Sequence, residues 1–410
     1  MQRARIRVFL PLRGARIAAV SRLLLFLMLS LSGAGFSTPP LAASTEESEA
    51  LAQRARNREP AAIAKLLERA NSGDAEAQLR VGEIYYEGLV VERNFALALD
   101  WFRRAAGKGQ PQAMNLLGHM YQEGLGVAKD YVEARLWYRQ AAEEGNAAAA
   151  NNLGWLYLKG YGTGKSPALA REWFERAANK EYPVALYNLG YIYSQGIGVE
   201  RDAERALDWL RKAADRGSVP AVRAIGWHYQ TGQGVPRDYA EAKQQYQKAA
   251  EQGDLEAVAM LGQLFQQGLG LPRDLDAARQ HYEKAAQGGD PLGQLYLGWI
   301  CQQGLGVAQD YAAALNWYRK SAEQGNATAQ NNVGYLYDEG LGVARDYKEA
   351  LTWYLKAAQQ EDPSALFNVG YMYEEAHGVA RDMNQAFRYY QRAADLGHQE
   401  ARRILGQAAR

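Results

Sequence analysis

The sequence predicts an all-α fold, a right-handed α/α solenoid of about ten helix-turn-helix repeats that are each 36 residues long. Three kinds of residue recur at this interval: glycines, side chains that can cap a helix, and large aromatic residues. The glycines keep the register without insertion or deletion, at Gly82, Gly118, Gly154, Gly190, Gly226, Gly262, Gly298, Gly334, Gly370 and Gly406. A fixed period of this length indicates stacked units, each burying its apolar face against its neighbours.

The first 43 residues have the pattern of an export signal and its cleavage region. Six arginines and no acidic residue occupy the first 22 positions, and the apolar run Leu23–Leu31 and several small residues follow. This order is typical of a secretory signal. The run is shorter than the ~20 residues that a transmembrane helix needs, so we expect no transmembrane span in the mature chain, with an uncleaved anchor as the alternative. We therefore expect an exported bacterial protein, either periplasmic or secreted.

Composition excludes some classes of function. The chain is 48% hydrophobic and 23% charged, which fits a large packed core. It has 47 basic and 46 acidic residues, and removing the six N-terminal arginines leaves 41 basic against 46 acidic residues. Such a balance gives no basic face for nucleic acid, so we expect no nucleic-acid partner. Cys301 is the only cysteine, which excludes an internal disulfide.

Each repeat is expected to contribute two helices. In the second repeat, residues 113–124 form the first helix, 124–130 the turn, and 131–145 the second helix. A residue whose side-chain oxygen can cap the second helix recurs at Asn94, Asp130, Ser166, Asp202, Asp238, Asp274, Asp310, Asp346 and Asp382. Glycine commonly ends that helix, and Lys180 and Gln360 are expected to take its place in the third and eighth repeats.

The organisation that follows has four parts. Residues 1–43 hold the signal peptide and its cleavage region, and residues 44–74 form an N-terminal capping helix or helices. Nine repeats occupy residues 75–397, and residues 398–410 form a C-terminal capping helix. Polar terminal caps are what a stacked array needs for solubility.

Small residues and large aromatic residues are expected to have different roles in the packing. The repeat glycine lies inside the first helix, where it costs about 1 kcal/mol relative to alanine, so we expect it to allow close approach of two helices. An Ala-Ala pair recurs late in the second helix for the same reason. The predicted core aromatic residues share one register of the second helix, at Trp101, Trp137, Trp173, Trp209, Trp317 and Trp353.

Together these features resemble the Sel-1-like repeat family, which is related to tetratricopeptide repeats. The shared pattern is Ala, Leu-Gly, Tyr, Gly-x-Gly-Val, Asp, Ala, Trp-Tyr and Ala-Ala, and it covers residues 61–410. The resemblance implies a solenoid that acts as an adaptor or scaffold for protein complexes, often in bacterial envelopes or secreted. The turn of the third repeat departs from the pattern (residues 160–167), and Ala376 stands where glycine recurs in the ninth.

The candidate binding residues are the aromatic side chains that directly follow the repeat glycine. On a helical wheel this position projects nearly opposite the apolar stripe, so it should face the concave inner surface. The aromatic residues here are Trp155, Tyr191, Trp227, Trp299, Tyr335 and Tyr371. Tyr and Trp supply large rigid contact area with a polar group, which suits partner binding. Packing is the alternative interpretation.

Asparagines recur two residues before the glycine, at Asn152, Asn188, Asn332 and Asn368. A side-chain amide can both donate to and accept from an extended peptide backbone, so these residues are candidates for partner binding. The alternative is that they form hydrogen bonds between repeats.

No catalytic or metal-ligating constellation is predicted. The five histidines lie in different repeats, and the glycine-rich turns lack the Gly-Lys-Ser/Thr of a phosphate loop. We therefore expect a non-catalytic scaffold without cofactor or metal, whose partners are proteins, envelope or cell-wall components among them. Peptidoglycan binding is an alternative, as is the β-lactamase-like activity linked to cysteine-rich relatives, although this chain lacks their paired cysteines. The sequence predicts no particular oligomeric state.

Overall fold

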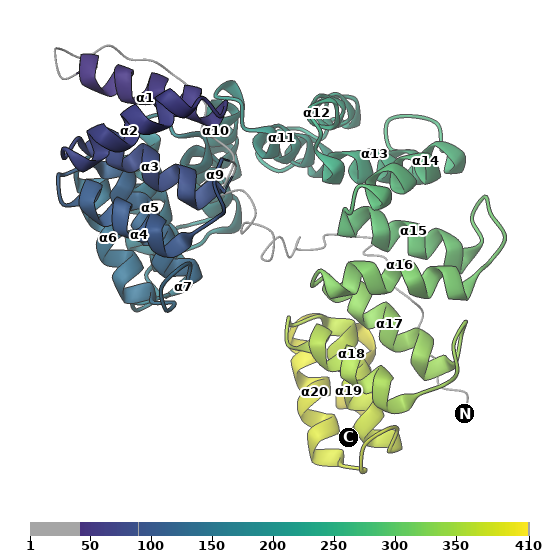
Figure 1. The fold of residues 1–410 in the computed structure, drawn as a ribbon. Coiled ribbons are helices and arrows are strands. Elements are labelled where there is room, and N and C mark those ends of the chain that lie inside the picture. The colour runs from purple at the N-terminus through teal and green to yellow at the C-terminus, as the bar shows by residue number, and fades with distance from the viewer. Residues whose placement is uncertain (1–41, 89, 409–410) are drawn as a thin grey trace. The chain divides into compact units, whose positions relative to one another are not determined.

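The computed structural model describes residues 42–88 and 90–408, which form 21 helices and no strand (Figure 1). The fold is an all-α solenoid of repeated helix-turn-helix units, as predicted. The expected signal segment lies almost wholly outside the described residues. In the described ranges, no helix has both the length and the apolar character needed to cross a bilayer.

The chain divides into two units, the first ending at Arg237 and the second beginning at Asp238. The helices of the first unit are α1 (Ala42–Arg56), α2 (Pro60–Asn71), α3 (Ala75–Glu87), α4 (Phe95–Ala106), α5 (Pro111–Glu123), α6 (Tyr131–Glu143), α7 (Ala147–Lys159), α8 (Pro167–Ala178), α9 (Pro183–Gln195), α10 (Ala203–Asp215) and α11 (Val219–Thr231). Those of the second unit are α12 (Tyr239–Glu251), α13 (Leu255–Gln267), α14 (Leu275–Gln287), α15 (Pro291–Gln303), α16 (Tyr311–Glu323), α17 (Ala327–Glu339), α18 (Tyr347–Ala358), α19 (Pro363–Glu375), α20 (Met383–Asp395) and α21 (Gln399–Ala408). In both units, odd-numbered helices from α3 to α19 are the first helices of the repeats.

Helices pack mainly against their neighbours in the chain. Within the first unit α5 packs on α6 and α6 on α7, and the second unit repeats this arrangement from α12 to α21. Because contacts are local, each repeat contributes one layer of a continuous core.

The helix-capping prediction is confirmed in all nine repeats. Asp130 is typical, since its Oδ1 accepts hydrogen bonds from the backbone N–H groups of Val132 and Glu133 at 2.8 and 3.1 Å. The equivalent residues from Asn94 to Asp382 likewise accept a backbone N–H in the first turn of the helix. A second set of caps, which the sequence analysis missed, begins first helices at Asp74, Asn146, Asp254, Asp290, Asn326 and Asp362.

The left-handed residue after the second helix lies one position later than expected in two repeats. Glycine takes this conformation in most repeats, as at Gly109 with φ 80°. In the third and eighth repeats the residues with positive φ are Glu181 (57°) and Glu361 (58°), so the expectation for Lys180 and Gln360 was wrong. After the first helix of the ninth repeat, Ala376 keeps the glycine conformation at φ 60°. A side chain in this region costs roughly 1–2 kcal/mol, and the surrounding turn must offset that cost.

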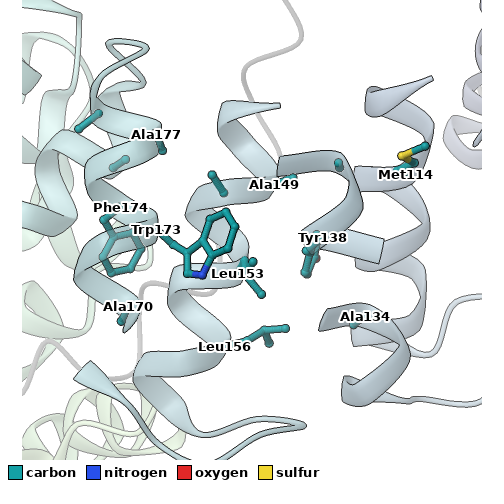
Figure 2. Close-up of a cluster of buried hydrophobic side chains, with 14 of the residues drawn as sticks. Met114, Ala134, Tyr138, Ala149, Leu153, Leu156, Ala170, Trp173, Phe174 and Ala177 are labelled. Atoms are coloured by element: carbon teal, nitrogen blue, oxygen red, sulfur yellow. The ribbon is translucent and has the colours of Figure 1, made fainter. Parts of the chain in front are cut away.

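The repeat glycine is explained by a ring that lies directly against it. A Cβ added to Gly118 would lie 2.5 Å from Cδ1 of Tyr138, and one added to Gly154 would lie 2.9 Å from Cδ1 of Phe174. These distances are shorter than van der Waals contact, so only glycine fits. The predicted close approach is confirmed. Figure 2 shows part of this core, in which Tyr138 and Phe174 belong to one buried cluster with Leu153.

In eight of the nine repeats the buried ring of the second helix lies one position after the predicted tryptophan register, and in the fourth repeat Leu210 occupies that position. The fully buried aromatic residues here are Phe102, Tyr138, Phe174, Tyr246, Tyr282, Tyr318, Tyr354 and Tyr390. Among the tryptophans themselves, Trp101, Trp173 and Trp353 are buried, whereas Trp137, Trp209 and Trp317 are only half-buried. The core prediction is thus wrong for these last three, because their position lies at the edge of the buried stripe.

Buried tyrosine hydroxyls have acceptors four residues after the repeat glycine. Tyr282 donates to Oε1 of Gln266 at 2.6 Å, and Tyr318 donates to Oε1 of Gln302 at 2.7 Å. In the third repeat the ring is Phe174, which has no hydroxyl, and the residue at the acceptor position is Leu158. In the third repeat the hydroxyl and its acceptor are thus replaced together, so neither is left buried without the other.

Candidate partner-binding surface

Six aromatic side chains follow the repeat glycine on first helices, and together they are called the aromatic row. Helices α7, α9 and α11 of the first unit carry Trp155, Tyr191 and Trp227, and α15, α17 and α19 of the second unit carry Trp299, Tyr335 and Tyr371. Every member is half-buried. They occupy the same register on successive first helices of each unit.

The row residues are not the ones that hold the repeats together. Leu153 and Leu156, on either side of Trp155 in the sequence, are fully buried and supply the apolar stripe of α7. The same holds in α17, where Val333 and Leu336 are fully buried around Tyr335. Trp155, Trp299 and Tyr335 pack against the core, while every ring of the row keeps part of its area accessible.

Further aromatic side chains extend the surface around Trp155. Tyr161, from the turn after α7, lies with its ring centroid 5.7 Å from that of Trp155. Tyr161 also stacks at 4.7 Å on Tyr131, the first residue of α6 in the preceding repeat. Three rings from two repeats therefore form one continuous aromatic surface.

The same arrangement recurs in the second unit. The ring of Tyr371 lies edge-on to His377 at 5.7 Å, and His377 stacks on Tyr347 at 4.0 Å. Tyr347 opens α18, as Tyr131 opens α6. Burial raises the pKa of the Tyr335 hydroxyl, so Tyr335 stays protonated and remains a hydrogen-bond donor at neutral pH.

The sequence analysis missed these additional rings although a signal was present. The residue after the N-cap of the second helix is aromatic in five repeats, at Phe95, Tyr131, Tyr239, Tyr311 and Tyr347. The recurrence of these aromatic residues was overlooked because the capping residue beside them already accounted for the regular spacing. The capping position and its neighbour have separate roles.

The asparagines of the candidate set are buried, and three of them donate a hydrogen bond to an asparagine of the preceding repeat. Asn188 donates from Nδ2 to Oδ1 of Asn151 at 2.8 Å, and Asn152 donates in the same way to Asn115 at 3.1 Å. In the second unit Asn368 donates to Asn331 at 2.9 Å. Each bond joins neighbouring repeats through residues 37 positions apart. The side-chain amides are buried and bonded within the protein.

Asn332 departs from this pattern. It is fully buried, and neither its Nδ2 nor its Oδ1 has a hydrogen-bond partner in the described structure. The hydroxyl of Tyr318 lies near this amide but donates to Gln302 instead. The residue 37 positions before Asn332 is Leu295, so the usual asparagine partner is missing. An unpaired buried amide destabilises the fold by roughly 1–3 kcal/mol.

The aromatic row stops short of the first repeat because α1 covers the equivalent position. Glu83 occupies the register there, is buried, and forms an ion pair with Arg56 of α1 at 3.1 Å. Arg56 also contacts Glu87, and Arg80 contacts Glu83 at 3.0 Å. The N-terminal helix thus occupies the position of the missing ring through charged contacts.

Groups that could hold a metal or act as a nucleophile are scattered. No cluster of three or more metal-ligating side chains occurs among the residues that the structure describes. Burial raises the pKa of the Cys301 thiol, and the charges of Asp310 and Glu283 act in the same direction. Cys301 is therefore a neutral, partly packed thiol at neutral pH.

Comparison with known proteins agrees with this repeat structure. The family model described as Sel1 repeat matches nine consecutive segments, residues 75–110, 111–146, 147–182, 183–218, 219–254, 255–290, 291–326, 327–362 and 363–398. Comparison with curated proteins gave no match.

Two solved structures are similar over most of their length. The structure described as c5321, a protective antigen present in uropathogenic Escherichia coli strains displaying an SLR fold, is 34% identical with a TM-score of 0.55. That match covers 84% of this chain and 82% of the other. A Sel1 repeat protein from Oxalobacter formigenes is 33% identical with a TM-score of 0.55, over 60% of this chain and 96% of the other.

Proposed function

The chain belongs to the Sel1 repeat family, and from this premise we propose that it is a non-catalytic scaffold that binds a segment of a partner protein on its aromatic row. Repeat folds of this kind generally serve protein–protein interaction, since stacked units create long surfaces for extended partners. The partner segment lies across successive first helices, and the order of the repeats sets its register. The proposal places the protein and its partner in the bacterial envelope, in keeping with the export pattern of residues 1–43.

One observation carries the proposal: the row consists of half-buried rings that keep part of their area accessible beside the fully buried residues of the core. Leu153, Leu156 and Phe174 fill the interior of the third repeat, while Trp155 stays partly accessible beside Tyr161. Interfaces concentrate their binding energy in such large aromatic anchors. The paired asparagines enter the proposal as positioning residues that fix the helices under the rings.

A triple substitution tests the row. Trp155→Ala/Trp227→Ala/Trp299→Ala removes three rings from the row, and we expect it to reduce recovery of specific partners from an envelope extract about tenfold, since aromatic anchors dominate interface energies. The measurement is a pull-down followed by mass spectrometry, with circular dichroism showing that the helical content is unchanged.

The chain offers a matched control for this experiment. Trp137, Trp209 and Trp317 are also half-buried but lie on second helices, two in the first unit and one in the second, as in the row variant. Trp137→Ala/Trp209→Ala/Trp317→Ala should keep the partners. Equal loss of partner proteins in both variants would overturn the proposal. It would also be overturned if no protein partner were recovered and the chain bound insoluble peptidoglycan through the row.

A further inference from the structure

The altered turn of the third repeat gathers lysines around exposed rings. Nζ of Lys159, at the end of α7, lies 5.0 Å from the ring centroid of Trp155. Lys129, from the turn before α6, lies 5.0 Å from the ring of Tyr131. Tyr161 links these two rings and is 39% exposed, so it is among the most exposed large aromatic side chains of the described structure. Lys165, whose positive charge acts on Lys159, completes this lysine–aromatic cluster, which lies wholly within the first unit.

Two of the lysines have no acidic partner. No carboxylate of the described residues lies within ion-pair distance of Lys159 or Lys165, whereas Arg56, Arg69 and Arg80 of the same unit are all paired. Burial lowers the pKa of Lys159, and the nearby positive charge of Lys165 lowers it further. The charge of Glu123 acts on Lys129. The cluster therefore holds unbalanced positive charge in a chain whose body is slightly acidic.

Lys159 differs from the other repeats in residue type, and Lys165 differs from several of them in its hydrogen bonding. The residue five places after the repeat glycine is acidic or neutral elsewhere, at Glu87, Glu123, Gln195, Thr231, Gln267, Gln303, Glu339 and Glu375. The position of Lys165 is usually arginine, and Arg201 and Arg273 donate there to the carbonyl oxygens of Ser194 and Gln266 at 2.9 and 3.1 Å. Lys165 makes no such bond, so its ammonium group remains available.

We infer that this lysine–aromatic cluster binds an acidic segment of the partner protein, in which carboxylates lie next to an aromatic or apolar side chain. The inference rests on the proposed function, because it names the chemistry of the segment that the row would hold. Carboxylates pair with the ammonium groups of Lys159 and Lys165, and the neighbouring side chain packs on Trp155 and Tyr161. Charge-assisted hydrogen bonds of this type are about twice as strong as neutral ones.

The charge distribution favours an acidic peptide over nucleic acid. A phosphate backbone needs positive charge along its whole track, because its affinity depends on neutralising many phosphates. At the position of Lys159 the preceding repeat carries the acidic Glu123 and the following repeat carries the neutral Gln195, so positive charge does not continue along the array at this position. A short acidic segment needs positive charge over only a short distance, as the cluster provides.

Selection from a random peptide library tests the inference without knowledge of the partner. Short random peptides are selected on the immobilised full chain, on Lys159→Gln/Lys165→Gln, and on the control Lys108→Gln/Lys180→Gln, which removes two exposed lysines of the same unit. We expect the wild type and the control to enrich Asp and Glu beside aromatic residues, and the cluster variant to lose about tenfold of that enrichment. Circular dichroism checks that all three proteins are equally folded.

The outcomes separate this inference from the proposed function. Enriched peptides that are not acidic, or acidic peptides that persist on the cluster variant, would overturn the inference and leave a peptide-binding row in place. No enrichment on the wild type would count against both. If a fluorescent single-stranded oligonucleotide binds through Lys159 and Lys165 and acidic peptides do not, the ligand of the cluster is nucleic acid and the inference is wrong.

Discussion

Replacing Gly334 with alanine is expected to destabilise the second unit by about 2–3 kcal/mol, because the new methyl group overpacks a closed core. Its Cβ would lie 2.7 Å from Cδ1 of Tyr354 and 3.1 Å from the carbonyl oxygen of Ala350. Tyr354 is 1% exposed, so its ring has no free space to move into. The loss outweighs the gain of about 1 kcal/mol that alanine normally brings to a helix interior.

Gly406 provides the matched control for this substitution. It occupies the same register in α21, but a Cβ there would meet nothing within 4 Å. Gly406→Ala should therefore leave stability unchanged or raise it by up to about 1 kcal/mol. Urea denaturation followed by circular dichroism measures both variants, and hydrogen exchange in α17 and α18 shows where the loss occurs. Similar values for the two variants would mean that helix propensity, and not ring contact, selects the glycine.

The second large effect is a difference between two buried asparagines. Asn188→Ala removes the donor to Asn151, which is 4% exposed, and leaves that carbonyl oxygen without its partner. We expect a loss of about 2–3 kcal/mol from the unpaired oxygen and the small cavity together. Asn332→Ala makes a similar cavity but removes two polar atoms that had no partner, so we expect a change within about 0.5 kcal/mol of zero.

Both asparagine variants are measured by the same urea denaturation experiment. Equal losses would contradict the view that Asn188 belongs to a hydrogen-bonded pair between repeats and that Asn332 does not. A further substitution, Leu295→Asn, should restore a partner in the register that Asn115 and Asn151 occupy. In the Leu295→Asn background, Asn332→Ala should then lower the free energy of unfolding by more than it does in the wild type.

Much of the fold was predictable because its signals are local. Capping residues such as Asp130 act within a few residues of their own position, and the 36-residue interval is visible because the pattern recurs along the chain. The close approach at Gly118 was also predictable, since a glycine inside a helix needs a compensating contact. Its partner Tyr138 lies on another helix, but the cost of the glycine is a property of its own helix.

The features that the sequence analysis missed depend on contacts between helices. Trp137 and Tyr138 are adjacent on one helix, and only the angle at which α5 and α6 pack decides that Tyr138 is the fully buried ring. Hydrogen bonds between repeats were the alternative interpretation of the asparagines, and the bond from Asn188 to Asn151 agrees with it. The particular partner was not predicted, because the bond joins residues 37 positions apart, one more than the repeat length. Glu83 is covered by α1, which lies outside the repeats and therefore does not share their pattern.

Photocrosslinking within the cell tests most directly whether the aromatic row is the partner surface. A photoreactive phenylalanine derivative replaces Tyr191 of the row in one strain and Trp209 of the second-helix register in another. Both positions are half-buried and lie in the first unit. A binding row predicts a covalent adduct with a partner polypeptide from position 191 and none from position 209. An adduct from position 209 with none from position 191 would contradict the proposed function and assign the partner to the second helices.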